Sequence, residues 1–346
     1  MNKYAKRYLI DALSGMAQGL FASLLVGTIV KTLGQQLLKL GENAFFNYLV
    51  TAGTFASDAK VFGAAMAVGI GFALKAPALV LFSLIAVGAA ANVTGAAGGP
   101  LAVLIIAIVA SECGSAVSKK TKVDILVTPL VTILSGLLLT VLTAKYIGMA
   151  ASSLGNLIMW ATNQKPFIMG MLISAIVGIA LTLPISSAAI CATLGLTGLA
   201  GGAAVAGCSA QMIGFAVMSF AENGWSGLIS QGLGTSMLQM PNIIKNPRIW
   251  IPPILASIIT GPLATCLFEL EMNGAAVSSG MGTCGLVGQI GVITGWAANP
   301  FFKPTAFDWI GLALISFVLP ALLSVAFCKA LKKLGWIKQG DMKLPD

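Results

Sequence analysis

The chain has 346 residues, of which 57% are hydrophobic and only 9% charged, and its formal net charge is +9. A soluble domain carries about 25% charged residues, so this chain cannot cover a water-facing surface and is predicted to be an integral membrane protein. Histidine is absent, which removes the usual acid–base group at neutral pH and the most common metal ligand. We therefore predict no enzyme activity, no metal site and no cofactor.

The positive charge indicates membrane topology and not nucleic-acid binding. Lysine and arginine gather at 3–7, 119–122, 245–248 and 329–343, always beside long apolar runs. Such clusters mark the cytoplasmic ends of membrane spans. The first apolar run is long and has no small-residue cleavage site before Lys31, so it is predicted to be a retained span and not a signal peptide.

The apolar runs predict an all-α polytopic membrane protein with about ten transmembrane helices, two re-entrant hairpins and an internal parallel repeat, all in one membrane domain over 1–346. The predicted spans are 9–32, 61–75, 77–93, 100–118, 123–146, 166–183, 184–198, 202–221, 249–269 and 306–330. The spans at 61–75 and 184–198 are short, which in transporters often marks the region of the binding site.

Four further segments complete the predicted topology. Segments 226–244 and 276–297 are rich in Gly, Ser, Thr and Gln, and we interpret them as re-entrant hairpins, because broken backbone is tolerated at membrane depth where it lines a cavity. Segments 41–58 and 147–163 are predicted to be helices in the outer membrane interface. With these four not crossing, both termini are cytoplasmic.

Two pairs of short motifs predict the repeat. GFALKAP at Gly71–Pro77 matches GIALTLP at Gly178–Pro184, and TGAAGG at Thr94–Gly99 matches TGLAGG at Thr197–Gly202. The predicted copies cover 9–118 and 123–221, and 222–346 forms a C-terminal part that contains the hairpins. Because each copy holds four spans, the copies have parallel orientation.

The glycine-rich motifs leave three interpretations. A phosphate loop needs GxxxxGK[ST], and neither copy has that pattern. Small residues also let helices pack closely, which we favour, and they allow backbone atoms to line a substrate cavity. The last two interpretations are compatible.

Polar side chains inside apolar segments are the candidates for ligand contact, because each is costly in lipid unless it faces protein or water. For any one of them, a helix cap or an interhelical hydrogen bond explains it equally well. As a group, amides with a few carboxylates suit a neutral polyol, since they donate and accept without a buried net charge. The predicted substrate-binding residues are Glu112, Gln211, Glu222, Asn223, Gln231, Gln239, Asn242 and Gln289.

Four longer motifs carry a family resemblance. They are LTLPISSAAI at 181–190, AQMIGFAVMSFAENG at 210–224, QGLGTSMLQMPNIIKNPRIWIPP at 231–253 and SGMGTCGLVGQIG at 279–291. The chain resembles, over nearly its whole length, the enzyme-IIC-like membrane proteins that include the perfringolysin O regulator. These are grouped with the sugar-permease subunits of the phosphoenolpyruvate-dependent phosphotransferase system. The resemblance implies a homodimer in the bacterial plasma membrane, re-entrant hairpins, and a sugar held between a carboxylate and amides.

The chain departs from such permeases in carrying no soluble IIB domain and no histidine, so any phosphorylation requires separate IIA- and IIB-type partner proteins. The leading hypothesis is a carrier for a polar small molecule, with a carbohydrate the expected ligand, the lipid bilayer its surroundings and no nucleic-acid partner. The alternative is a membrane sensor or regulator that has the same fold and binds its ligand without transport.

Overall fold

The computed structural model describes residue 4 and residues 6–344, and these described residues form helices joined by turns and irregular segments, without a strand. The chain divides into two compact units, unit 1 at Met1–Ala151 and unit 2 at Ser152–Asp346. The division lies in the helix α9, well after the boundary at 118–123 expected from the repeat. Each unit is described by itself below.

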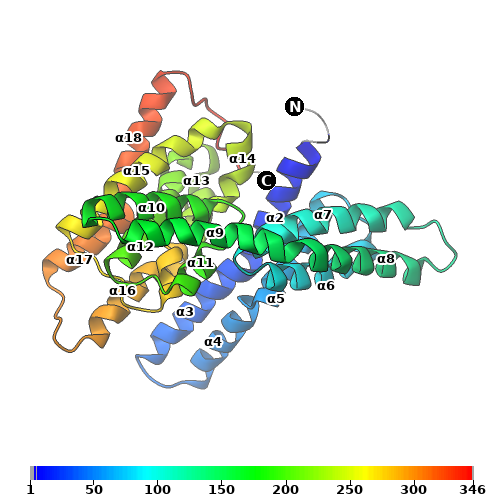
Figure 1. The fold of residues 1–346 in the computed structure, drawn as a ribbon, viewed down its shortest axis with the longest axis horizontal. Helices are drawn as coiled ribbons and strands as arrows, with labels where there is room; N and C mark the ends of the chain where they lie inside the picture. The colour runs from blue at the N-terminus through cyan, green and yellow to red at the C-terminus, as the bar shows by residue number, and fades with distance from the viewer. Residues whose placement is uncertain (1–3, 5, 345–346) are drawn as a thin grey trace. The chain divides into compact units, whose positions relative to one another are not determined.

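Unit 1 is built from long apolar helices (Figure 1). In chain order its elements are η1 Lys6–Asp11, α2 Ala12–Leu20, η2 Phe21–Leu25, α3 Val26–Leu38, α4 Ala44–Ala56, α5 Ala59–Ala73, α6 Ala78–Gly95, η3 Ala96–Gly98, α7 Gly99–Val117, α8 Asp124–Leu139, η4 Thr140–Ala144 and the start of α9 Lys145–Thr162. The first four follow one another without interruption and make one helical stretch of 33 residues.

The chain reverses direction in unit 1 at the first glycine-rich motif. Ala96 has a φ of +45°, which ends α6, and α7 then packs back along it. Asn92 supports the neighbouring helix start, because its Nδ2 donates to the carbonyl of Ala59 over 2.7 Å. The reversal explains why Ala78–Val117, a helical stretch of 40 residues, corresponds to the two separate spans predicted at 77–93 and 100–118.

Unit 2 surrounds one buried helix, α12. Its elements are α10 Pro166–Thr182, α11 Ser187–Leu194, α12 Gly198–Met218, α13 Phe220–Ile229, η5 Ser230–Gly234, η6 Ser236–Gln239, α14 Met240–Lys245, η7 Pro247–Trp250, α15 Ile251–Pro262, η8 Leu263–Leu267, η9 Ala276–Gly280, η10 Cys284–Leu286, α16 Val287–Ala298, α17 Ala306–Ala313, η11 Leu314–Val318 and α18 Leu319–Lys333. Helix α12 packs against α10, α15 and α18, and 89% of its most apolar window is buried.

Small residues explain how α12 fits among three helices. A Cβ on Gly207 would overlap the backbone carbonyl of Ser174 in α10, and a Cβ on Gly214 would meet the side chains of Ser324 in α18 and Pro253 in α15. Glycine at these positions therefore allows the close approach. For the glycines inside α12, the structure favours the close-packing interpretation.

The described residues contain six helical stretches that are long and apolar enough to cross a membrane, or seven if α4 and α5, bent by 56°, form one broken span. The predicted total of ten is not confirmed. The span predicted at 166–183 corresponds to α10, an apolar helix of 17 residues. The span predicted at 184–198 contains only α11, with 8 residues, which is too short to cross the hydrocarbon core.

The two predicted hairpins are chains of short helices. Segment 226–244 contains the end of α13 and then η5, η6 and α14, with an extended residue at Thr235 (φ −157°, ψ 143°). Segment 276–297 contains η9, a turn, η10 and most of α16. Neither is among the stretches long enough to cross, and their re-entry into a membrane stays a prediction. The interfacial segments 41–58 and 147–163 are helical, as α4 and α9.

The parallel repeat is not confirmed. Both glycine-rich motifs lead into a buried helix, α7 after the first and α12 after the second. The preceding helices differ, since α6 has 18 residues and α11 has 8. The second motif is also paired with an extended segment, because Gly198 and Met272 exchange backbone hydrogen bonds of 3.0 Å in both directions.

Candidate functional site

Polar groups gather at the two ends of the central helix of unit 2. Leu199, at the start of α12, lines a cavity, which we call the pocket. Phe215 and Met218, near the end of α12, pack against the C-terminal residues of the chain. Because α12 has 21 residues and a helix rises 1.5 Å per residue, the two ends lie about 30 Å apart.

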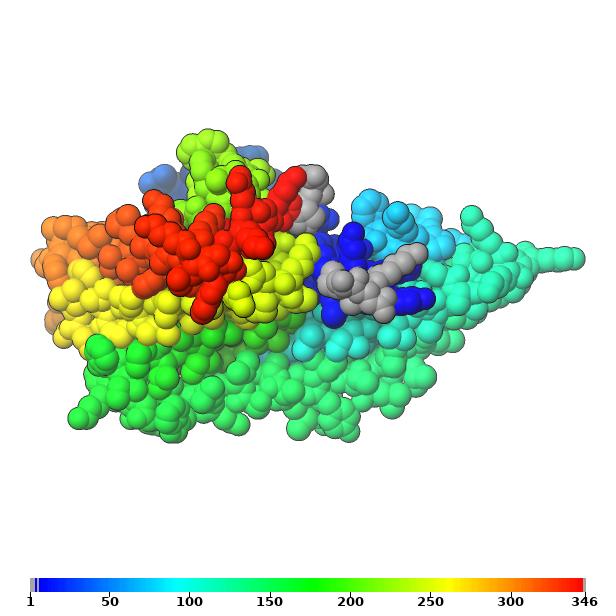
Figure 2. All heavy atoms as spheres, turned by 90° about the horizontal axis from the view of Figure 1, so that it is seen from above, coloured from blue at the N-terminus to red at the C-terminus, as the bar shows by residue number. Residues whose placement is uncertain are grey.

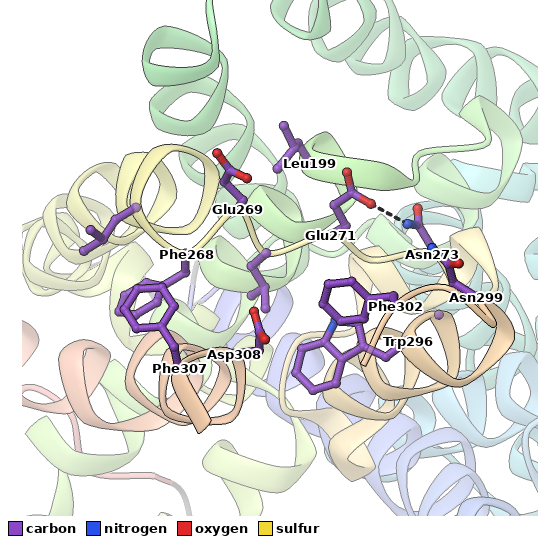
Figure 3. A pocket seen from close by; sticks show the side chains of 13 residues that line it. Leu199, Phe268, Glu269, Glu271, Asn273, Trp296, Asn299, Phe302, Phe307 and Asp308 are labelled. Carbon is purple, nitrogen blue, oxygen red and sulfur yellow. Dashed lines mark hydrogen bonds between the residues drawn. The ribbon is translucent and has the colours of Figure 1, made fainter. Parts of the chain in front are cut away.

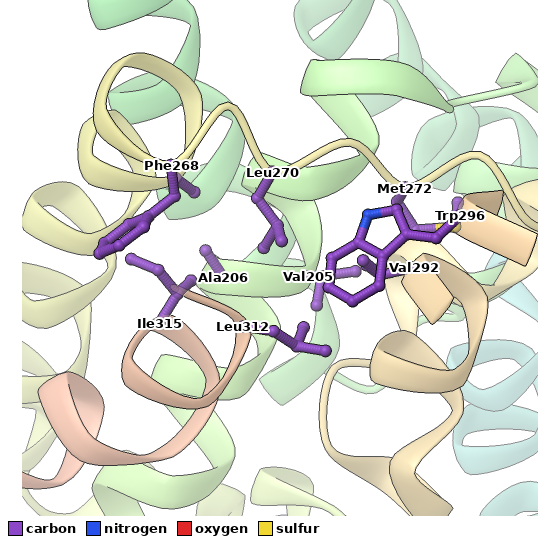
Figure 4. Packing of buried hydrophobic residues seen from close by; sticks show 10 residues of the cluster. Val205, Ala206, Phe268, Leu270, Met272, Val292, Trp296, Leu312 and Ile315 are labelled. Atoms are coloured by element: carbon purple, nitrogen blue, oxygen red, sulfur yellow. The ribbon is translucent and has the colours of Figure 1, made fainter. Parts of the chain in front are cut away.

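The pocket has a volume of about 370 Å³, and one wall of it is the segment 269–273, which pairs with Gly198 through Met272. Its side chains alternate, so that Leu270 and Met272 are buried while Glu269, Glu271 and Asn273 are exposed. Leu270 and Met272 join a hydrophobic cluster with Val205, Ile315 and Trp296 (Figure 4). This alternation leaves the polar side chains on the exposed face of the segment, and they line the pocket together with Leu270 (Figure 3).

Gly202 explains why this segment lies so close to α12. A Cβ on Gly202 would overlap the backbone carbonyl of Leu270, so any larger residue would displace the wall of the pocket. Glu269 has a φ of +43°, a left-handed conformation that is uncommon for residues other than glycine. Such conformations occur where the surrounding structure holds them, often at ligand sites.

Aromatic rings form the other wall of the pocket. The ring of Trp296 lies 6.1 Å from that of Phe302, and the ring of Phe268 lies 5.0 Å from that of Phe307, between centroids. The Trp296 side chain is only 8% exposed. Its indole N–H makes no hydrogen bond with any described residue. A buried indole usually has a hydrogen-bond acceptor, so this donor is available to a ligand.

The carboxylates of the pocket retain free acceptor oxygens. Glu269 has no partner among the described residues, and Glu271 Oε2 accepts one hydrogen bond of 2.7 Å from Asn273 Nδ2. Asp308 Oδ2 accepts two bonds of 2.7 Å from the backbone N–H and the hydroxyl of Thr305, as the cap of α17. No lysine or arginine lines the pocket among the described residues. The pocket therefore offers acceptors, two amides and an apolar wall to a ligand that carries donors.

The predicted substrate residues at the other end of α12 form a different arrangement. Gln239 Nε2 donates to Gln231 Oε1, and Asn242 Nδ2 donates to Gln239 Oε1, both over 2.9 Å. Gln231 Nε2 also donates to the hydroxyl of Ser219 over 2.9 Å. These side chains are at most 3% exposed. We call Gln231, Gln239 and Asn242 the amide cluster.

The C-terminal residues 341–344, which we call the C-terminal segment, occupy the open side of the amide cluster. Gln239 Nε2 donates to the carbonyl of Met342 over 2.9 Å, and Asn242 Nδ2 donates to the carbonyl of Lys343 over 2.9 Å. Glu222 and Asn223, also predicted to bind substrate, bind the same segment. The structure thus brings five of the eight predicted residues together and fills their site with the chain itself.

The three remaining predicted residues lie elsewhere. Gln211 is fully buried in α12, where its Oε1 accepts from Trp250 Nε1 over 2.9 Å and its Nε2 donates to Ser257 Oγ over 3.3 Å. Gln289 Nε2 donates to Ser209 Oγ over 3.2 Å. Glu112 belongs to unit 1. Gln211 therefore links helices α12 and α15 and the turn η7 inside the core.

Glu112 forms an ion pair of 2.7 Å with Arg7, and both side chains are over a third exposed. Arg7 also donates to the carbonyl of Leu74 over 3.3 Å. The contact joins α7 to the first helical stretch and to the end of α5. Among the described residues, no group of three or more His, Cys, Asp and Glu residues could hold a metal ion.

Sequence reasoning missed the pocket. The available signal was FELEMN at 268–273, where apolar and polar residues alternate with the period of a strand between two helical patterns. The span predicted at 249–269 includes the first two residues of this motif. The aromatic residues of the pocket come from separate elements, which only folding brings together.

A family model described as "Phosphotransferase system, EIIC" matches residues 10–344. The match includes both units and all residues of the pocket and the amide cluster. The comparison with curated proteins gave no match.

Proposed function

The chain belongs to the phosphotransferase system EIIC family, a membrane component of sugar transport, and we propose that it binds a carbohydrate in the pocket of unit 2 and carries it across the membrane. The observation that supports this proposal is the composition of the pocket. One wall carries Glu269, Glu271 and Asn273, and the opposite wall carries Trp296 and Phe302.

This composition matches the chemistry of a sugar. The hydroxyl groups of a sugar donate to carboxylate oxygens and accept from amide and indole N–H groups, while its C–H face packs on an aromatic ring. The volume of about 370 Å³ is at the lower end of the range for small-molecule pockets. A monosaccharide or a disaccharide fits that size better than a longer chain.

The distribution of charge supports an orientation. Lys245 contacts Asn242 of the amide cluster, and α18 with its lysines packs against Ile243 beside it. The pocket end carries Glu269, Glu271 and Asp308, with Lys303 in a neighbouring cavity. Positive residues are retained on the cytoplasmic side. The pocket then opens to the outside of a bacterial plasma membrane, and both termini lie in the cytoplasm.

Labelling with a membrane-impermeant thiol reagent tests the orientation. A Lys338→Cys variant in intact cells is expected to stay unlabelled, and Asn273→Cys is expected to react. Both are made in a Cys266→Ser background, because Cys266 is an exposed native thiol. Ready labelling of Lys338→Cys from outside would overturn the orientation.

The proposed partners follow from the family. Separate IIA- and IIB-type proteins supply the phosphoryl group at the cytoplasmic face, and the working form is a homodimer. The stretch Asp124–Thr162 needs an apolar neighbour to cover it, since only 22% of its most apolar window is buried. Lipid and a second copy are the two surfaces that can cover it. The mass of the protein in lipid nanodiscs distinguishes them, and a monomer there would contradict the homodimer.

Binding and transport assays test the proposed ligand. The purified protein is titrated with a panel of labelled neutral sugars, and Trp296→Ala or Glu271→Gln is expected to weaken binding by about ten-fold or more, since each removes a hydrogen-bond or packing partner. Trp225→Ala is the matched control, because Trp225 is 70% exposed on α13 and does not line the pocket. Equal affinity in all three variants would contradict the pocket as the sugar site.

Uptake by proteoliposomes separates a carrier from a sensor. A protein that binds a sugar of the panel and moves it into vesicles with IIA and IIB supplied is a carrier. A protein that binds the sugar at the pocket without moving it is a regulator with the same fold, which would overturn the carrier half of the proposal.

A further inference from the structure

The charge in the pocket has one sign. Three carboxylates line it, Glu269 and Glu271 from the segment 269–273 and Asp308 from the first turn of α17. None of the three forms an ion pair with a lysine or arginine among the described residues. Like charges that share a cavity repel one another, so a positively charged ligand relieves a repulsion that a neutral ligand leaves in place.

The free polar atoms of the pocket are mostly acceptors. Both oxygens of Glu269, Oε1 of Glu271 and Oδ1 of Asp308 have no hydrogen-bond partner among the described residues. The side-chain nitrogens without a hydrogen bond there are the indole Nε1 of Trp296 and Nδ2 of Asn299. A ligand that satisfies these atoms brings more donors than acceptors. An ammonium group carries three donors and no acceptor.

The indole N–H of Trp296 shows that the ligand also needs an acceptor. The Trp296 side chain is 8% exposed, and the nitrogen of its indole ring faces the wall that carries Glu271 (Figure 3). A donor held at this depth without a partner is costly. Because an ammonium group cannot accept a hydrogen bond, a simple amine leaves this donor unpaired. A hydroxyl oxygen on the same ligand pairs with it.

Aromatic rings complement the carboxylates. Phe268, Trp296, Phe302 and Phe307 all line the pocket. The face of an aromatic ring attracts a cation that lies within about 6 Å of its centroid, and tryptophan is the strongest of the three aromatic residues in this respect. Carboxylates and aromatic rings in one cavity are the combination that an organic ammonium group requires.

Two other kinds of charged ligand fit less well. Among the described residues, no group of three or more His, Cys, Asp and Glu side chains could hold a metal ion, so the three carboxylates do not converge on one small cation. An anionic sugar would add a negative charge to the pocket. The positive residue in this region, Lys303, lines a neighbouring cavity and not the pocket.

The pocket is at the surface of unit 2. Phe307 and Asp308 belong to α17, whose residues are orange in Figure 2, and the side chains of Glu269 and Glu271 are exposed. Carboxylates in this position attract a cation over about 8–10 Å at moderate salt. The same charges therefore steer a cationic ligand into the pocket and hold it there.

We propose that the pocket selects a sugar or polyol that carries a protonated amino group. The ammonium group lies beside Glu269 and Glu271, with Asp308 as a third negative charge, and a hydroxyl group of the same molecule accepts from the indole N–H of Trp296. This inference rests on the proposed function for the site and for the carbohydrate class, and it adds the charge that decides which carbohydrate binds.

Sets of three ligands that differ at one carbon test the charge. Glucose has a hydroxyl group there, glucosamine an ammonium group and N-acetylglucosamine a neutral amide, and the same sets exist for galactose and mannose. Each ligand is titrated into the full chain in detergent by calorimetry. In at least one set, the aminated sugar is expected to bind about ten-fold or more tightly than both neutral sugars. Equal or weaker binding of the aminated sugar in all sets would overturn the inference.

A neutral substitution of Glu269 identifies the counter-charge. Glu269→Gln keeps the size of the side chain and is expected to lower the affinity for the aminated sugar by about ten-fold, and for its neutral parent by less than about three-fold. Glu42→Gln is the matched control, because Glu42 is exposed in unit 1 and its loss changes the net charge of the protein equally. Equal losses for both sugars in Glu269→Gln would contradict recognition of the ammonium group.

Salt dependence tests the same point without a variant. Raising sodium chloride from about 50 mM to about 500 mM screens the attraction between exposed charges. The affinity of the wild-type protein for the aminated sugar is expected to fall by about three-fold or more, and that for the neutral parent to stay unchanged. The same response to salt for both sugars would overturn the inference.

Cyclohexylamine, an ammonium group on a six-membered ring without hydroxyl groups, separates this inference from the proposed function. If aminated and neutral sugars bind equally and Trp296→Ala weakens both, the proposed function stands and the selection for an amine fails. If cyclohexylamine binds as tightly as any aminated sugar, the pocket recognises an amine alone, and the carbohydrate of the proposed function fails. Binding of the aminated sugar about ten-fold more tightly than cyclohexylamine supports both.

Discussion

Three buried hydroxyl groups of unit 1 and three buried amides of unit 2 find their hydrogen-bond partners in different ways. In unit 1, Ser83, Thr132 and Thr140 donate to the carbonyl four residues earlier in their own helix, so these groups are satisfied locally. In unit 2, Gln211, Gln231 and Gln239 are bonded to residues on other elements. A hydroxyl that is bonded within its own helix has its donor in use. An amide that bonds to another element can exchange that partner for a ligand.

Exposure also differs between one long stretch of unit 1 and the central helix of unit 2. The stretch Asp124–Thr162, which lies largely in unit 1, has 22% of its most apolar window buried, against 89% for α12 of unit 2. An apolar helix that is mostly exposed needs lipid or another protein to cover it. We therefore expect Asp124–Thr162 to contact the surroundings and α12 to support the proposed ligand site, and three substitutions test this comparison.

The largest effect is expected for Gly202→Leu. The new side chain would collide with the backbone of Leu270, and backbone cannot move aside as a flexible side chain can. We expect a loss of about 2 kcal/mol or more in the free energy of unfolding through overpacking, together with weaker sugar binding, because Leu270 lies in the wall of the pocket. Thermal unfolding in detergent and the sugar titration measure the two effects.

Gly41→Ala is the control for this variant, since a Cβ on Gly41 meets nothing within 4 Å. A Gly202→Leu protein of normal stability that no longer binds sugar would show that this glycine serves the ligand alone. A protein unchanged in both measurements would contradict the position of the extended segment.

An intermediate effect is expected for Gln211→Leu, set against Thr132→Val in unit 1. The first variant leaves Trp250 Nε1 without its acceptor inside the core, which costs about 1–3 kcal/mol. The second removes a hydroxyl whose partner carbonyl, that of Thr128, keeps its bond within the helix, so the cost is smaller. Equal losses of thermal stability in the two variants would contradict the difference between hydrogen bonds within one helix and hydrogen bonds between elements.

The smallest effect is expected for Glu112→Gln. The ion pair with Arg7 is more than a third exposed at both side chains, and exposed ion pairs contribute about 0–1 kcal/mol. Sugar affinity is expected to stay unchanged, and a rise in salt concentration should have the same small effect on the wild-type stability. A loss of sugar binding in a stable Glu112→Gln protein would return Glu112 to the ligand site, where the sequence had placed it.

The sequence identified the family through four long motifs, and the family model confirmed it. It also identified the helical class, because a chain with 9% charged residues has to satisfy its backbone internally in lipid. The number of spans was harder to predict. Hydropathy does not show that Ala96 reverses a 40-residue helical stretch, or that residues after Pro184 form only a short helix, because turns at membrane depth depend on packing against neighbouring helices.

For the site, the sequence by itself determined which residues are polar in an apolar setting, and so it found Gln231, Gln239 and Asn242. Only the tertiary structure decided what they contact, because Met342 and Lys343 are about a hundred residues away along the chain, and residue spacing carries no information on such a contact. The pocket was decided in the same way. Glu271 and Trp296 have no shared pattern in the sequence, and they face one cavity because Gly202 allows an extended segment to lie against α12.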